Sequence, residues 1–158
     1  MEASLAYLAR FASTRKSLAL YLRKKFVAPE SGELEPLIEA CLTRLEELQL
    51  IDDARYTEDR ARGLRAQGKS ARAIRDRLRK KGAPGEMVDD VLRGEDDEAE
   101  LVAAVRHTKR RRLGPFRRAP GEFTRELAVM ARAGYSYEIA RRALELSLSD
   151  AEALIQAR

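Results

Sequence analysis

The stretch GLRAQGKS, residues 63–70, matches the pattern G-x-x-x-x-G-K-S of a phosphate-binding loop. In such a loop the backbone N–H groups surround the phosphates of a nucleotide, the lysine contacts them, and the serine hydroxyl contacts a magnesium ion. This chemistry requires a buried strand before the first glycine and a helix after the serine. With those elements in place, the chain would be a nucleotide-hydrolysing enzyme.

The neighbouring sequence argues against this chemistry. The segment before Gly63 is DDARYTEDRAR, which is charged at most positions and cannot be a buried strand. No apolar run ending in aspartate follows Ser70, so no residue is placed to hold magnesium. We therefore predict that Gly68 ends one helix, that Lys69 lies in solvent and that Ser70 caps the next helix.

Other catalytic or metal-binding patterns are also missing from the sequence. The single histidine, His107, has no second histidine or cysteine nearby, and no Ser/His or Cys/His set with a third partner is apparent. No paired carboxylates stand in apolar surroundings. We therefore expect a protein that is not an enzyme, with no catalytic residues and no metal site.

Apolar residues recur at steps of three and four along most of the chain, which is typical of amphipathic helices. No alternating strand pattern is found, and Asp52, Asp53 and Ser70 are natural N-caps. The segment LGPFRRAPG, 113–121, holds two prolines and two glycines and is predicted to be a loop. The pattern predicts an all-α fold with helices near 33–49, 54–64, 71–81, 87–92, 101–108, 122–133 and 136–147.

Charge and cysteine content indicate what kind of partner the protein binds and in which compartment it works. The formal net charge is +5 and the isoelectric point about 9.5, which favours an anionic partner, either nucleic acid or an acidic protein surface. One cysteine, Cys41, allows no disulfide within the chain and fits a reducing compartment, so we expect a cytoplasmic protein. The start of the sequence does not resemble a signal peptide, and no apolar run approaches the ~20 residues of a membrane span.

The sequence contains an internal repeat, which accounts for its organisation better than a nucleotide-binding loop does. KKGAPGEMVDDVL (80–92) aligns without gaps with RAGYSYEIARRAL (132–144), and LALYLRKKF (18–26) aligns more weakly with IRDRLRKKG (74–82). Gly82 and Gly134 occupy equivalent places, where we predict left-handed backbone. Each unit would contain three helices, and such units usually bury their faces against their neighbours in an elongated stack.

Two clusters of basic residues stand out. Between residues 60 and 81 the only acid is Asp76, whereas ten positions are cationic: Arg60, Arg62, Arg65, Lys69, Arg72, Arg75, Arg77, Arg79, Lys80 and Lys81. The second cluster is KRRR at 109–112, followed by Arg117 and Arg118. Close like charges repel, so an anionic partner would relieve a cost, but either cluster could also be a solvated surface. Tyr135 and Tyr137 could stack on bases or pack against the repeat core.

The sequence resembles the RecX family, whose members regulate the bacterial RecA recombinase. The resemblance rests on YLARF with STRKSLALYLRKK, on LEELQLIDDARYTEDRAR, on GKSARAIRDRLRKKG and on RAGYSYEIARRAL, and it covers roughly residues 5–148. It implies three tandem three-helix repeats in an elongated, curved arrangement, with units at 1–51, 52–94 and 95–148 and a C-terminal tail at 149–158. It also implies no catalysis and no cofactor.

The resemblance further implies a monomer that binds the RecA filament on DNA and inhibits its ATPase activity, strand exchange and persistence. The partner-binding residues expected for the filament or its DNA are Arg65, Lys69, Arg72, Arg75, Arg79, Lys80, Lys81, Lys109, Arg110 and Arg111. The alternative is an independent basic helical module that binds nucleic acid. The two differ in salt response, because pure phosphate binding weakens steeply with salt.

Overall fold

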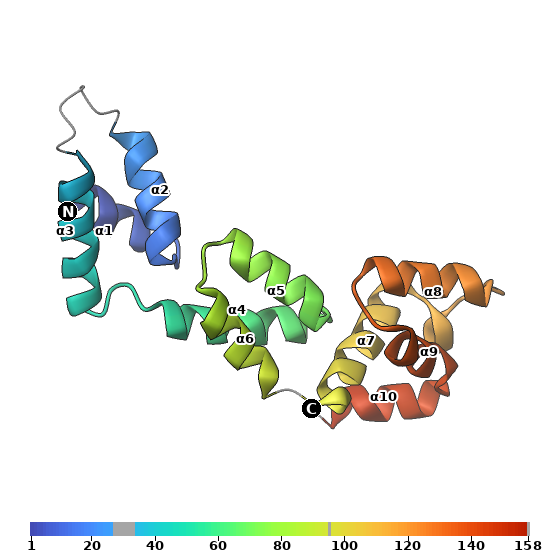
Figure 1. Ribbon diagram of the computed structural model, residues 1–158. Coiled ribbons are helices and arrows are strands. Elements are labelled where there is room, and N and C mark those ends of the chain that lie inside the picture. The colour runs from blue at the N-terminus through green and yellow to red at the C-terminus, as the bar shows by residue number, and fades with distance from the viewer. Residues whose placement is uncertain (27–33, 95, 158) are drawn as a thin grey trace.

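The computed structural model describes residues 1–26, 34–94 and 96–157, and all regular structure within them is helical (Figure 1). The helices follow one another in three groups along an elongated molecule. Their bounds are α1 (Glu2–Leu8), α2 (Arg15–Lys25), α3 (Leu34–Glu47), α4 (Asp53–Ala66), α5 (Ala71–Lys80), α6 (Gly85–Arg93), α7 (Asp97–Arg111), α8 (Phe123–Arg132), α9 (Tyr137–Glu145) and α10 (Leu148–Gln156). The predicted all-α fold is confirmed.

Each group of helices has a separate apolar core. Leu42 is buried among α1–α3, Ile74 among α4–α6, and Met130 among α7–α10. This differs from the expectation that the units bury apolar faces against one another. Because each unit completes its own core, the contacts between units can be polar, and those contacts position the basic residues considered below.

The C-terminal part of the chain differs from the sequence prediction in two places. Residues 149–158 were expected to form a tail, but most of them belong to α10, whose Ala151 is buried in the core of the third unit. The predicted loop at 113–121 contains a short 3-10 turn, Gly114–Phe116. The buried carboxylate of Glu126 holds this turn by accepting from the backbone N–H of Gly114 at 3.0 Å.

The GLRAQGKS stretch has the helical structure predicted for it. Gly63 lies inside α4, and the segment before it is helix, not strand. Gly68 has a φ of 65° and ends that helix, while the hydroxyl of Ser70 caps α5 by accepting from the N–H of Ala73 at 3.2 Å. Lys69 was expected in solvent but is partly buried.

The two repeat glycines have the predicted backbone. Gly82 has a φ of 81° and Gly134 a φ of 92°, which is the left-handed region that residues with a Cβ rarely adopt. Each glycine also lies against the preceding unit. A Cβ on Gly82 would stand 2.8 Å from the Cβ of Lys16, and one on Gly134 would stand 2.6 Å from the hydroxyl of Ser70. The glycines therefore serve the junctions between units as well as the helix ends.

Candidate partner-binding surface

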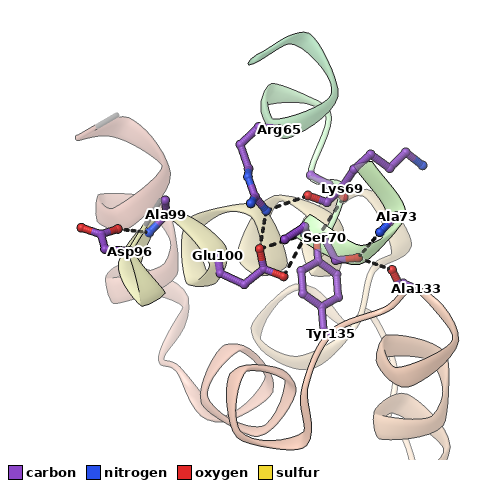
Figure 2. A network of polar contacts seen from close by, with 11 residues as sticks. Arg65, Lys69, Ser70, Ala73, Asp96, Ala99, Glu100, Ala133 and Tyr135 are labelled. Carbon is purple, nitrogen blue, oxygen red and sulfur yellow. Dashed lines mark hydrogen bonds and ion pairs between the residues drawn. The ribbon is translucent and has the colours of Figure 1, made fainter. Parts of the chain in front are cut away.

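A network of polar contacts joins the second and third units (Figure 2). The hydroxyl of Ser70, besides capping α5, donates to the carbonyl oxygen of Ala133 at 2.7 Å. The N–H of Ala71, the first residue of α5, donates to the Glu100 carboxylate on α7 at 3.1 Å. Glu100 also forms an ion pair with Arg65, whose side chain is only 11% exposed. A negative charge at the start of α5 is favourable because it opposes the positive end of the helix dipole.

Tyr135 completes the contact between the second and third units, which we call the second junction. It is buried, and its hydroxyl donates to the carbonyl oxygen of Gly68 at 3.1 Å. Its ring lies against that of His107, with 5.7 Å between the ring centroids. Burial, together with the negative charge of Glu100, raises the pKa of Tyr135 far above its ordinary value. Tyr135 is therefore a packing residue and not a platform for bases, whereas Tyr137 is exposed.

The first junction, between the first and second units, has the same arrangement of hydrogen bonds with different residues. The hydroxyl of Thr14 caps α2 by accepting from the N–H of Ser17 at 3.1 Å, and it donates to the carbonyl oxygen of Lys81 at 2.6 Å. The N–H of Arg15 donates to the Asp53 carboxylate on α4 at 2.8 Å. Thr14 and Ser70 are equivalent in the weaker repeat alignment, so both junctions use the cap of the second helix in a unit to bind the next unit.

Three of the predicted partner-binding residues form ion pairs within the protein. Arg65 is committed to Glu100 and to the carbonyl oxygen of Lys69. Arg75 and Arg79 both bind Asp89 of α6, with N–O distances of 2.9 and 3.1 Å. Hydrogen bonding from Arg75 holds the pKa of Asp89 below its usual range. Within residues 60–81 the only acid is Asp76, but α6 brings Asp89 to this face from outside that range.

The remaining predicted residues are more accessible. Arg72, Lys80, Lys81 and Arg111 are exposed or partly exposed. The ammonium group of Lys109 lies over the ring of Phe116, 5.7 Å from its centroid. Arg110 is exposed but donates to the carbonyl oxygen of Gln67 and to Nδ1 of His107.

The positive charges near the second junction affect one another. Partial burial lowers the pKa of Lys69, and the charges of Arg110 and Arg77 lower it further. Burial likewise lowers the pKa of His107, with further contributions from Arg110, Lys69 and Arg111. His107 is therefore neutral at pH 7. Such crowding of cations marks the place where an anion would be most strongly attracted.

The described residues include no group of three or more histidine, cysteine or acidic side chains that could hold a metal ion. Within the same residues, no helix is long and apolar enough to cross a membrane.

Comparisons with known proteins agree with this architecture. Residues 52–92 match the family description "RecX, second three-helix domain". A regulatory protein RecX of Myxococcus xanthus is 37% identical over 155 residues, covering 91% of this chain and 83% of the relative. The chain belongs to the RecX family. A RecX relative from Agrobacterium fabrum is 29% identical over 89% of this chain and 77% of its own.

Two solved RecX structures share the fold. The crystal structure of RecX from Lactobacillus salivarius superimposes with a TM-score of 0.71 at 23% identity, covering 91% of both chains. A second RecX crystal structure gives a TM-score of 0.67 at 25% identity, covering 94% of this chain and 69% of the other. The arrangement of three helical units is thus the RecX fold, and the regulatory class of the family applies to this chain.

Proposed function

We propose that this protein regulates the RecA recombinase by binding RecA filaments on DNA, and that it lowers their ATP turnover, strand exchange and persistence. Membership of the RecX family carries this proposal. The elongated row of three units supports it, because an elongated molecule can lie along a filament. The positive charge of the chain suits a partner that contains DNA.

The contacts with the partner would come from the accessible basic residues. We assign Arg72, Lys80, Lys81, Lys109 and Arg111 to the partner surface, with partly buried Lys69 beside them. Arg65 instead stabilises the junction between units through Glu100. Arg75 and Arg79 contribute less than their number suggests, because Asp89 already neutralises part of their charge. We also propose that the three units span residues 1–51, 52–94 and 95–148.

The test is ATP turnover by RecA on single-stranded DNA, measured with and without this protein. We expect turnover to fall as the protein is added, and we expect the protein alone to hydrolyse no ATP. Inhibition should persist in part as salt is raised, because contacts with RecA protein are less salt-sensitive than phosphate contacts. RecA turnover that is unchanged at every protein concentration would contradict the proposal. Salt-sensitive binding to naked DNA without any effect on RecA would favour the independent nucleic-acid-binding module.

A further inference from the structure

Two hollows occupy corresponding places in the second and third units. The first, of about 200 Å³, lies between the C-terminal parts of α4 and α5. The second, of about 380 Å³, lies between the C-terminal parts of α7 and α8. In each unit these are the first and second helices, so the repeat places one hollow in each.

Cationic residues take part in the lining of both hollows, and the surface of the first is mostly apolar, with Leu64 and Leu78 in its lining. The cationic residues of the first are Arg60, Arg77, Lys80 and Lys81, and those of the second are Lys69, Arg110, Arg111 and Arg132, with His107 beside them. The alignment of 80–92 with 132–144 sets Lys80 on Arg132, but Lys81 falls on Ala133. The third unit therefore draws its other cations from α7 and from Lys69 of the preceding unit. The positive lining is present in both hollows although the contributing positions differ.

Among the residues that the structure describes, no ion pair joins any of the eight to a carboxylate, in contrast to Arg65 with Glu100 and Arg75 with Asp89. Neutral His107 accepts a hydrogen bond at Nδ1 from Arg110, at 3.1 Å, and so orients that guanidinium. Lys69 itself lines the second hollow, and the charges of Arg110 and Arg77 both lower its pKa.

We propose that the two hollows bind phosphate groups of one nucleic-acid backbone. A nucleic acid carries a negative charge at every nucleotide, whereas a protein surface mixes both signs. Eight cations in the hollows of two successive units, none of them in an ion pair within the described residues, therefore match a phosphodiester chain better than they match an acidic protein patch. Guanidinium and ammonium groups bind phosphate oxygens through charge-assisted hydrogen bonds. This deepens the proposed function, since the RecA filament contains DNA, but the test below does not require RecA.

The test removes two charges from each hollow separately. One variant carries Arg77→Gln with Lys80→Gln, and the other carries Arg111→Gln with Arg132→Gln. Arg110 is left unchanged because it also binds the carbonyl oxygen of Gln67. The control carries Arg141→Gln with Arg142→Gln, which removes two exposed charges from α9, outside both hollows. Circular dichroism checks that all three variants keep the helix content of the parent.

Affinity for a fluorescent oligodeoxythymidylate is then measured by anisotropy across a series of salt concentrations. Each hollow variant should bind about tenfold or more weakly, which is the scale of losing one charge-assisted hydrogen bond. The slope of log affinity against log salt should fall by about 1.4, or roughly 0.7 for each phosphate that is no longer neutralised. The control should bind at most about threefold more weakly and keep its slope.

Equal losses of affinity in the hollow variants and the control would overturn the proposal, because the effect would then reflect net charge alone. Unchanged oligonucleotide binding together with weaker binding to RecA would also overturn it, since the hollows would then receive carboxylates of a protein. If the hollow variants behave as expected while the parent leaves RecA turnover unchanged, the phosphate sites stand and the regulatory proposal fails.

Discussion

The two junctions between units share a plan but differ in how completely they are closed. In both, a hydroxyl that caps one helix donates to a carbonyl of the next unit, and a carboxylate of the next unit accepts from the first N–H of that helix. The second junction adds the ion pair of Arg65 with Glu100 and the buried ring of Tyr135. At the first junction, the repeat places Ala83 where Tyr135 stands.

The loop before the capping hydroxyl shows the same difference. Gly68 is buried against α7, whereas Ala12, two residues before Thr14, is exposed. A hollow of about 500 Å³ remains at the first junction, with Leu8, Ala12, Leu50 and Tyr56 in its lining. A shared set of hydrogen bonds therefore fixes how neighbouring units are joined, while side-chain volume and charge decide how strongly they are held.

The largest expected effect is a difference in stability between variants of the two junction carboxylates, Glu100 and Asp53. Glu100→Gln should lower the free energy of unfolding by about 3 kcal/mol, because it leaves the largely buried charge of Arg65 without its partner carboxylate. Asp53→Asn is the matched change at the first junction and should cost about 1 kcal/mol or less. Burial raises the pKa of Asp53, so its charge is already disfavoured there. Urea unfolding of both variants measures the difference, and equal losses of stability would remove the distinction between the junctions.

A smaller effect comes from the two glycines of GLRAQGKS. Gly68→Ala should destabilise the protein by about 2 kcal/mol, because the residue has positive φ and the new Cβ would stand 2.8 Å from the backbone nitrogen of His107. Gly63→Ala, inside α4 with no atom within 4 Å of the new Cβ, should stabilise by about 0.5–1 kcal/mol. Opposite signs in thermal melting are expected. A stable Gly68→Ala protein would show that α7 yields easily at the second junction.

The smallest effect is a pH dependence confined to the second junction. The pKa of His107 in the folded protein is lowered from 6.5, so the unfolded chain binds a proton more readily as the pH falls through that value. This contribution to stability is complete above pH 6.5 and is lost below it. The melting temperature should therefore fall as the pH is lowered from about 7.5 to about 5.5.

The control for this prediction is His107→Gln, which removes the only histidine of the sequence. The variant should lose most of the fall in melting temperature between these pH values. A pH dependence that is the same in both proteins would assign it to carboxylates elsewhere.

Local features of the fold could be predicted from the sequence, because they depend on neighbours in the chain. Asp52 caps α4 as expected, accepting from the N–H of Arg55 at 2.9 Å, and Gly82 and Gly134 have left-handed backbone. Asp53 could not be assigned correctly in this way. It was expected to cap its own helix but binds the start of α2, 38 residues earlier in the sequence.

The availability of the basic residues was the part that the sequence could not reveal. Asp89 lies 10 residues beyond Arg79 and reaches it only because α6 packs beside α5. In the same way, Arg65 resembles a surface cation until α7 brings Glu100 beside it. Charge counts along a sequence measure composition, whereas accessibility depends on which helices pack together.

The double use of the capping hydroxyl bears on how such a chain could grow by duplication. Each of the first two units has a capping hydroxyl that binds the next unit. Each of the last two units has a helix that ends in a glycine lying against the previous unit. The second unit has both, in Ser70 and Gly82. A duplicated unit would bring both halves of the joint with it. Since each unit also has its own apolar core, an added copy would expose no large apolar surface. The protein could therefore remain folded after each duplication.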